Sequence, residues 1–251
     1  MTYKNSKVII IAAGLGSRLR PLTKNKPKCL VKIKKKSLLD RQLEVFKKNK
    51  LNNINIIVGH KKEKLQKLKY NFFENKNYRK NNILNSLFSA KKIISGSIII
   101  SYSDIIFKNR LIKKLMSARS DISVLVDKSW KNNYKDRKLH PISEAENVVY
   151  DKKLNIKKAG KIIGKKEANG ELIGLFKLSP KGSKIFKHYY HLAKKKFNRK
   201  KFYSAATFQK AYITDFLNFL IDNRVKVKSN LVSGGWMEID TSEDLKRAER
   251  F

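Results

Sequence analysis

The chain has 251 residues, of which 41% are hydrophobic and 10% aromatic, which excludes general disorder and suffices for one large α/β domain over residues 1–251. The 59 Lys and Arg residues outnumber the 20 Asp and Glu residues, for a formal net charge of +39. The lysines are spread over nearly every segment, so we expect a compositional bias and no dedicated nucleic-acid surface, although a basic surface still attracts nucleotides.

Three features bear on the location of the protein. No apolar run approaches the roughly 20 residues of a membrane span, so no membrane partner is expected. Residues 1–7 carry no signal-peptide pattern, and the single cysteine, Cys29, excludes an intrachain disulfide. These features favour the cytoplasm, and they leave open whether the chain forms an oligomer.

Apolar runs alternate with amphipathic stretches along the chain, which predicts successive strand–helix units and a mostly parallel sheet. Strands are expected at residues 8–13, 54–58, 98–101, 122–126, 172–178, 225–228 and 236–240, with short β pieces at 147–150 and 155–158. Helices are expected after an N-cap at Ser37 and at residues 63–70, 81–94, 110–119, 181–196, 204–222 and 242–250. The segment 128–170 is otherwise polar and broken.

The loop after the first strand is rich in glycine and basic residues. Gly14 and Gly16 let the backbone approach a phosphate closely, and Arg18 and Lys28 add positive charge to the same place. Two familiar phosphate loops do not fit. A dinucleotide fingerprint needs a third glycine at position 19, and residues 19–21 lack the Gly-Lys-Ser/Thr of a Walker A loop. The residues nevertheless predict a site for a nucleoside triphosphate.

Three carboxylates predict a metal site. Asp104 follows an apolar strand, at the edge where open α/β sheets bind ligands. Glu238 and Asp240 are two apart on a strand, so their side chains face the same way while Ile239 faces the core. Carboxylate oxygens that meet near a triphosphate suit Mg²⁺.

The stretch from Ala12 to Ile33, AAGLGSRLRPLTKNKPKCLVKI, resembles the signature of the nucleotidylyltransferases, which join a nucleoside monophosphate to a phosphorylated acceptor and release pyrophosphate. Segments 82–88, 100–105, 126–130, 160–161, 173–177 and 236–241 are similar to one branch, that of the phosphocholine, 2-aminoethylphosphonate and phosphoglutamine cytidylyltransferases. The resemblance covers essentially the whole chain. It implies a Rossmann-like three-layer sandwich with a mostly parallel mixed sheet, of the nucleotide-diphospho-sugar transferase type.

The resemblance also implies roles for individual residues. Asp104 and Asp240 would bind Mg²⁺ with Glu238 close to it, and Arg18 and Lys28 would neutralise phosphate charge during catalysis. The nucleotide would contact the following residues: Ala12, Ala13, Gly14 and Gly16 in the loop, with Asn82 and Ser86 as polar readers of the base. An Asn at a helix start also fits a plain N-cap.

The acceptor site is expected between Trp130 and Asp215. Lys161 is a candidate for the acceptor's phosphate, and Trp130 and Tyr134 could face a cationic amine through their rings. Asp215 falls on the apolar stripe of the helix expected at 204–222, where a buried carboxylate requires a cation opposite it. Weaker candidates are Tyr102, Glu144 and Glu146, and the four histidines are expected to be structural or surface residues.

These observations together predict an enzyme that transfers CMP from CTP, with Mg²⁺, to a small phosphorylated or phosphonate acceptor bearing an amine. The attacking oxygen is largely anionic near neutral pH, because a phosphate monoester has a second pKa of about 6, so no Ser, Cys or His nucleophile is needed. A sugar-1-phosphate nucleotidylyltransferase is the nearest alternative, although Ala159-Gly160-Lys161 keeps only the Lys of the Glu-Lys-Pro motif usual in that branch. A basic nucleic-acid-binding protein is the alternative from another class. Spacing alone does not select cytosine.

Overall fold

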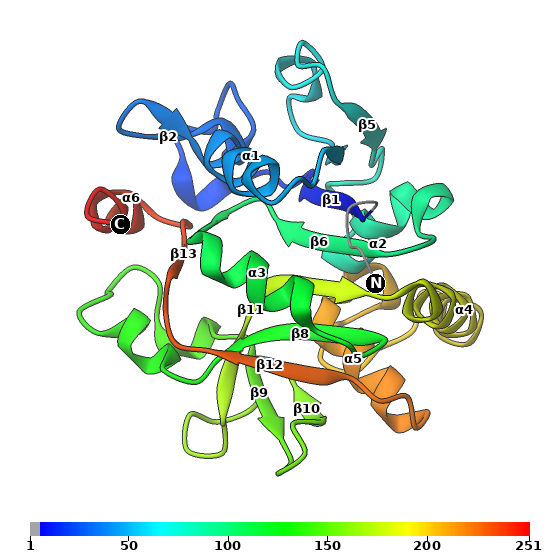
Figure 1. Cartoon of the computed structure of the whole chain (residues 1–251). Helices are drawn as coiled ribbons and strands as arrows, with labels where there is room; N and C mark the ends of the chain where they lie inside the picture. The colour runs from blue at the N-terminus through cyan, green and yellow to red at the C-terminus, as the bar shows by residue number, and fades with distance from the viewer. Residues whose placement is uncertain (1–5) are drawn as a thin grey trace.

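A computed structural model describes residues 6–251. The expectation about a signal peptide concerned residues 1–7, and residues 1–5 lie outside the described part of the chain. Helices separate successive groups of strands along the chain (Figure 1). The strands are β1 (Lys7–Ala12), β2 (Lys32–Ile33), β3 (Lys36–Ser37), β4 (Asn53–Val58), β5 (Asn71–Glu74), β6 (Ile98–Tyr102), β7 (Ile105–Phe107), β8 (Ile122–Asp127), β9 (Asn147–Tyr150), β10 (Ile156–Ala159), β11 (Gly170–Leu178), β12 (Lys228–Val232) and β13 (Trp236–Glu238). The α-helices are α1 (Leu38–Lys48), α2 (Ile83–Leu87), α3 (Asn109–Ser117), α4 (Pro180–Phe197), α5 (Ile213–Asp222) and α6 (Ser242–Ala248).

A nine-stranded mixed sheet forms the centre of the molecule. Its strands follow the order β10-β9-β11-β6-β1-β4-β5, and β8 pairs with β11 and with β12. β1 runs parallel to β4 and β6, whereas β11 runs antiparallel to β6, β8 and β9. Two small antiparallel sheets, β2–β3 and β7–β13, complete the strand pairing of residues 6–251. The carboxyl ends of β1 and β6 therefore lie side by side, where an open α/β sheet binds its ligand.

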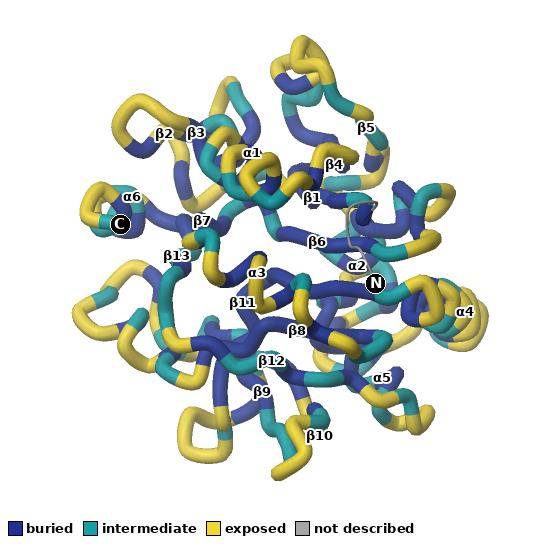
Figure 2. Tube along the Cα trace, viewed as in Figure 1, coloured by how far each residue is buried: buried dark blue, intermediate teal, exposed yellow. Residues whose placement is uncertain are grey.

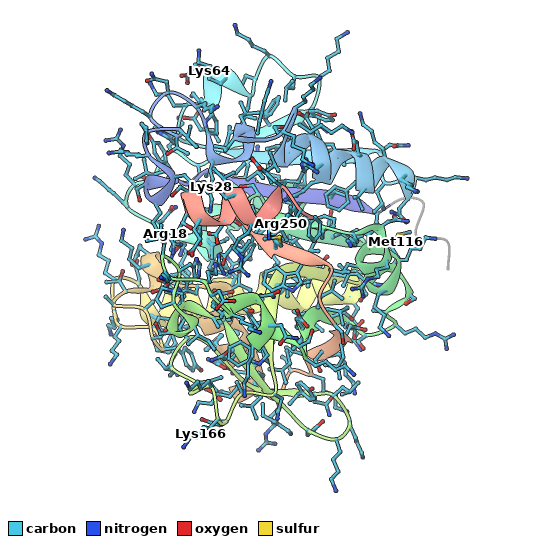
Figure 3. All side chains as sticks on the ribbon, turned by 90° about the vertical axis from the view of Figure 1, so that its left-hand side faces the viewer. Arg18, Lys28, Lys64, Met116, Lys166 and Arg250 are labelled. Atoms are coloured by element: carbon cyan, nitrogen blue, oxygen red, sulfur yellow. The ribbon has the colours of Figure 1, made fainter. Side chains whose placement is uncertain are left out.

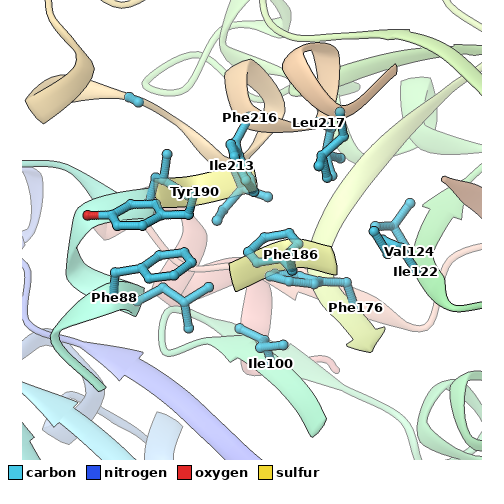
Figure 4. Packing of buried hydrophobic residues seen from close by; sticks show 14 of the residues in the cluster. Phe88, Ile100, Ile122, Val124, Phe176, Phe186, Tyr190, Ile213, Phe216 and Leu217 are labelled. Carbon is cyan, nitrogen blue, oxygen red and sulfur yellow. The ribbon is translucent and has the colours of Figure 1, made fainter. Parts of the chain in front are cut away.

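Helices cover both faces of the sheet, which gives three layers. Alternate residues of β1 point to opposite faces: Ile9 packs in the cluster that includes α2, α4 and α5, and Ile10 in the cluster that includes α1 and α3. Aromatic rings fill the first cluster, where Phe88 and Tyr190 stack and Phe186 meets Phe216 edge to face (Figure 4). Buried residues follow the strands and exposed ones follow the loops and outer helix faces (Figure 2). The predicted α/β architecture is confirmed.

The predicted elements agree with the structure where a local signal is strong. Ser37 caps α1: its Oγ accepts from the N–H of Asp40 at 3.0 Å, and Asp40 Oδ2 accepts from the N–H of Ser37 at 3.2 Å. Between residues 6 and 251, no helix combines the length and apolar character that a membrane crossing requires.

Four predicted elements differ clearly from the structure, and three of them differ in extent or position. The helix expected at 63–70 is only a 3-10 turn, Lys62–Lys64, because Leu65 is the single buried residue from 62 to 69 and one apolar anchor does not hold a helix. The helix expected at 81–94 is divided in two: α2 covers Ile83–Leu87, and a 3-10 helix follows at Phe88–Ile93. The strand expected at 225–228 lies at Lys228–Val232, and the sequence does not predict the short strands β2, β3, β5 and β7.

The helix expected at 204–222 is the largest difference, since α5 begins only at Ile213. Asp215 sets this start: its Oδ2 accepts from the N–H of Tyr212 at 2.9 Å. Its Oδ1 accepts from the N–H and the Oγ of Ser204, at 2.9 and 2.6 Å. Segment 204–212 therefore folds back over the N-terminus of α5 instead of extending it.

Candidate active site

A cavity of about 460 Å³ opens at the carboxyl ends of β1 and β6. Its wall contains five of the six residues predicted to bind the nucleotide: Ala12, Gly14, Gly16, Asn82 and Ser86. Ala13 lies behind the wall, buried, with its carbonyl accepting from the N–H of His60 at 3.2 Å. We refer to this space as the first cavity.

The loop between β1 and Lys28 is held in one shape by its own residues. Gly16 has a φ of +61°, and a Cβ there would lie 2.9 Å from Cβ of Lys28. Only glycine combines this conformation with so close an approach. The buried Thr23 donates its hydroxyl to the carbonyl of Gly16 at 2.8 Å, and Nε2 of His60 lies 3.1 Å from the carbonyl of Thr23. The glycine turn is therefore supported from below by Thr23 and His60.

Asn82 and Ser86 have structural partners as well as a place on the wall. Oδ1 of Asn82 accepts from the N–H of Ile83 at 2.9 Å, so Asn82 is the N-cap of α2. Oγ of Ser86 accepts from Nδ2 of Asn75 at 2.8 Å. No motif in the sequence distinguishes Tyr78, Arg79, Asn81 and Lys210 from the many other polar and basic residues of the chain. The sequence therefore does not predict these residues, although they also lie in the wall.

Strand pairing brings the three predicted metal carboxylates together from distant parts of the chain. Glu238 of β13 is paired with Ile105 of β7, and the N–H of Ile239 donates to the carbonyl of Asp104 at 2.8 Å. Ile239 is fully buried, as predicted, and Glu238 and Asp240 turn the other way. The tight turn that carries Asp104 is held by Gln42, whose Nε2 donates to the carbonyls flanking it, those of Tyr102 and Ile105, at 2.8 and 2.7 Å.

Two cations from the phosphate loop, Arg18 and Lys28, contact these carboxylates. Figure 3 labels these two side chains near each other on one side of the molecule. Nη2 of Arg18 lies 2.5 Å from Oδ2 of Asp240. Nζ of Lys28 donates to Oδ2 of Asp104 at 2.8 Å and also to Oδ1 of Asp240. Lys28 therefore bridges two carboxylates, with 11% of its side chain exposed, whereas Arg18 is 49% exposed.

The pKa values reflect this concentration of charge. Burial alone would lower the pKa of Lys28, but Asp104 and Asp240 outweigh burial and raise it. Burial alone would raise the pKa of Asp240, but Lys28 and Arg18 hold it well below its usual range. Burial, then Asp240 and Asp104, raise the pKa of Glu238 well above its usual range. The charge of Glu238 is therefore less well compensated than that of Asp240.

The donor set fits a divalent cation. Oδ1 of Asp104 is buried and has no hydrogen-bond partner among residues 6–251, and Lys28 already places positive charge between Asp104 and Asp240. His140, which the sequence did not single out, also contacts the group: its Nδ1 lies 3.3 Å from Oδ2 of Asp240, and its Nε2 lies 3.5 Å from Oε2 of Glu238. Burial, then the charge of Arg137, lower the pKa of His140 to about 4, so the imidazole is neutral.

A second cavity, of about 190 Å³, adjoins the first and shares Arg18, Asp104 and Asp240 with its wall. Lys161, the residue predicted to bind the acceptor's phosphate, lies in this wall. Its Nζ donates to Oε2 of Glu144 at 2.6 Å and lies 5.4 Å from the centre of the Tyr212 ring. Burial alone would lower the pKa of Lys161, but the bond to Glu144 raises it, so this lysine carries its charge.

Two further carboxyl groups line the second cavity, Glu146 and Glu171. Burial raises the pKa of Glu146 to about 7, against the opposing charge of Lys161, and raises the pKa of Glu171 to about 8. Oε2 of Glu171 is buried without a hydrogen-bond partner in the described part of the chain. Tyr102 lies beside Glu146, with its hydroxyl 3.5 Å from Oε2.

Three residues predicted at the acceptor site do not line the second cavity. Trp130 is 1% exposed and packs with Tyr134 and Ala145 in a small apolar cluster, away from the lining of the second cavity. The Tyr134 hydroxyl donates to Glu171, so Tyr134 supports a wall residue from behind. The expectation that a cation opposes Asp215 is wrong, because backbone N–H groups and the Ser204 hydroxyl satisfy its carboxylate.

The two cavities meet at one group of carboxylates and cations, so a nucleoside triphosphate and a phosphorylated acceptor can face each other across it, as a nucleotidyltransferase requires. Residues 8–161 match the family described as MobA-like NTP transferase domain. The CTP:phosphoglutamine cytidylyltransferase of Campylobacter jejuni is 33% identical over 249 residues, which span 95% of this chain and 97% of that protein. The chain therefore belongs to the MobA-like NTP transferase family and is a nucleotidyltransferase.

Two further comparisons agree with this membership. The choline-phosphate cytidylyltransferase of Streptococcus pneumoniae is 41% identical over 107 residues, 41% of this chain and 47% of that protein. The solved structure of the CTP:phosphocholine cytidylyltransferase from Streptococcus pneumoniae superposes with a TM-score of 0.73 at 24% identity, covering 98% of both chains. Its similarity supports the fold, and the relatives named here are cytidylyltransferases that act on phosphorylated substrates.

Proposed function

We propose that this protein transfers CMP from CTP to a small phosphorylated or phosphonate acceptor that carries an amine, with release of pyrophosphate. The observation that carries the proposal is the wall shared by the two cavities, where Asp240, Asp104 and Arg18 face both spaces. An acceptor oxygen in the second cavity can then attack the α-phosphorus of a nucleotide in the first. One P–O bond forms, and the bond to the pyrophosphate oxygen breaks.

The chain's own residues position and neutralise the reactants. Backbone N–H groups of the glycine loop would bind phosphate oxygens, while Arg18 and Lys28 offset the charge that develops around the α-phosphorus. Lys161 would bind the acceptor's phosphate or phosphonate. Asp104 and Asp240, with Glu238, would hold Mg²⁺, which when bound supplies charge stabilisation to the phosphate oxygens.

The second cavity supports an acceptor with a positive charge. Glu146 and Glu171 have raised pKa values because they are buried without a full counter-charge. A bound ammonium would supply that charge. Tyr102 and Tyr212 add ring surface to the same wall, which favours a cation further. The relatives' own substrates, phosphoglutamine and choline phosphate, both pair a phosphate with a nitrogen-bearing group.

Pyrophosphate release tests the proposal. Purified protein is assayed with each of four NTPs against phosphocholine, 2-aminoethylphosphonate, phosphoethanolamine, phosphoglutamine and sugar 1-phosphates. We expect turnover with CTP and an amine-bearing acceptor, and no turnover for Asp104→Asn or Asp240→Asn. Asp222→Asn, an exposed aspartate at the far end of α5, is the matched control and should stay active.

Two outcomes would redirect the assignment. Preference for a sugar 1-phosphate would favour the nearest alternative, a sugar-1-phosphate nucleotidylyltransferase. Salt-sensitive binding to DNA or RNA without turnover of any NTP would favour a nucleic-acid-binding protein instead. Near wild-type rates in either aspartate variant would refute the assigned metal ligands.

A further inference from the structure

His140 occupies an unusual position at the rear of the second cavity. Its side chain is 2% exposed, and both ring nitrogens face carboxylate oxygens, of Asp240 at 3.3 Å and of Glu238 at 3.5 Å. Neither nitrogen forms a hydrogen bond with any residue in the range 6–251. A buried polar atom without a partner is costly, so native structures rarely keep one unless something else binds it.

We propose that His140, Glu238 and Asp240 bind a second divalent cation, and that His140 makes this position selective for Mn²⁺, Co²⁺ or Zn²⁺ over Mg²⁺. One ligand atom from each residue lies within 4.8 Å of the other two. With bonds of roughly 2.0–2.2 Å, ligands at tetrahedral angles are about 3.3–3.6 Å apart, so the three atoms need to approach one another by roughly 1 Å. Small side-chain adjustments therefore suffice to close the three atoms on a metal.

This position differs from the one between Asp104 and Asp240. Nζ of Lys28 lies between those two carboxylates, on the side of the first cavity. Of the first and second cavities, His140 and Glu238 line only the second, and Asp240 is shared by both positions. The proposal rests on these side chains alone and holds whether or not the acceptor is the one proposed above.

The chemistry of the ligands sets the selectivity. Mg²⁺ prefers oxygen ligands in near-ideal octahedral geometry, whereas imidazole nitrogen suits the later first-row metals and zinc. A site with one neutral imidazole and two carboxylates therefore favours metals that accept both nitrogen and oxygen. Nη2 of Arg137 lies 3.9 Å from Oε2 of Glu238, so a metal bound here would share this carboxylate with a cation of the protein.

Mn²⁺ binding to the nucleotide-free protein tests the proposal by pulsed electron paramagnetic resonance, in which a directly bound nitrogen modulates the Mn²⁺ echo. We expect ¹⁴N modulation in the wild type, replaced by the ¹⁵N pattern when histidine is labelled with ¹⁵N. His140→Phe should abolish it and weaken Mn²⁺ affinity at least about tenfold. Asp104→Asn should retain it. His188→Phe, an exposed histidine on α4, is the matched control.

The wild-type spectrum decides the question even if a variant fails to fold. A Mn²⁺ complex without nitrogen modulation, or one in which the modulation persists in His140→Phe, overturns the proposal. Because no nucleotide or acceptor is present, a failure here is distinct from a failure of the proposed transferase reaction. Equal affinities for Mg²⁺ and Mn²⁺ in the wild type would refute the selectivity.

Discussion

Replacing Lys28 with Met tests how the carboxylate cluster is stabilised before any substrate binds. Methionine keeps the apolar stem that packs beneath Gly16 and removes the ammonium between Asp104 and Asp240. Among residues 6–251, Arg18, which is half exposed, is then the one lysine or arginine still paired with Asp240. Removing one partner of a buried ion pair costs about 3–5 kcal/mol, and we take the lower end, about 3 kcal/mol, because 27% of the Asp104 side chain is exposed.

This loss corresponds to a fall in Tm of about 6–12 °C for a chain of this size. A divalent cation at the same carboxylates would offset the missing charge, and at 100 times its Kd it adds about 2.7 kcal/mol to the free energy of unfolding. We therefore expect Mg²⁺ or Mn²⁺ to restore most of the Tm of Lys28→Met and to raise that of the wild type less. Activity should fall whether or not the metal is present.

Differential scanning fluorimetry with and without metal measures the effect, and Lys32→Met, an exposed lysine of β2, is the matched control. A metal-free Lys28→Met protein that melts within about 2 °C of the wild type, a difference of 1 kcal/mol or less, would refute the reasoning. So would a loss of stability that metal does not change, since Lys28 would then act through packing and not through its charge.

Three other substitutions follow from the site. Gly16→Ala and Gly96→Ala both place a side chain at positive φ, and each should lose roughly 1–2 kcal/mol of stability. In Gly16→Ala the new methyl group would lie 2.9 Å from Cβ of Lys28, whereas in Gly96→Ala it would have no atom within 4 Å. Gly16→Ala should therefore raise the KM for CTP and Gly96→Ala should not. Equal effects of the two variants on this KM would contradict the expectation. Because burial raises the pKa of Glu146 to about 7, its carboxyl is neutral below that pH and charged above it. We therefore divide kcat/KM of the wild type for an amine-bearing acceptor by kcat/KM of Glu146→Gln, and expect this ratio to rise between about pH 6 and pH 8. A ratio that does not change with pH would show that Glu146 does not contact the amine. Lys161→Met should raise the acceptor KM about tenfold, since a charge-assisted hydrogen bond contributes about 1.5–3 kcal/mol, and should leave the KM for CTP unchanged; the exposed Lys166→Met is its control. An equal rise in both KM values would place Lys161 outside the acceptor site.

Sequence patterns were reliable where a residue's role depends on its near neighbours. The strand at 8–13, the N-cap at Ser37 and the glycine turn all follow from burial, capping or φ preferences within a few residues. The apolar stripe on segment 204–222 gives a wrong prediction, because it too considers only residues that are near neighbours in the sequence. Apolar spacing predicted one helix, but hydrogen bonds from Ser204 to Asp215 fold the first part of the segment back.

Chemistry predicted for single side chains was less reliable, because it depends on what packs against them. Asp215 carries a carboxylate at an apolar position, which suggested a cationic partner, yet N–H groups at a helix start satisfy it. Trp130 and Tyr134 have rings that suit a cation, but Trp130 lies inside a small core and the hydroxyl of Tyr134 is bound to Glu171. His140 carried no local signal, since the residues it meets are far along the chain.

The sequence by itself therefore determined the glycine loop, its cations and the strand ends that carry Asp104, Glu238 and Asp240, since each of these is a property of a short segment. The tertiary structure alone decided which of these segments meet. The register of β13 on β7 sets Asp104 beside Glu238, and the loop after β8 brings His140 against both Glu238 and Asp240. Such contacts depend on the packing of the whole sheet, because no short stretch of chain specifies the position of a residue a hundred places away.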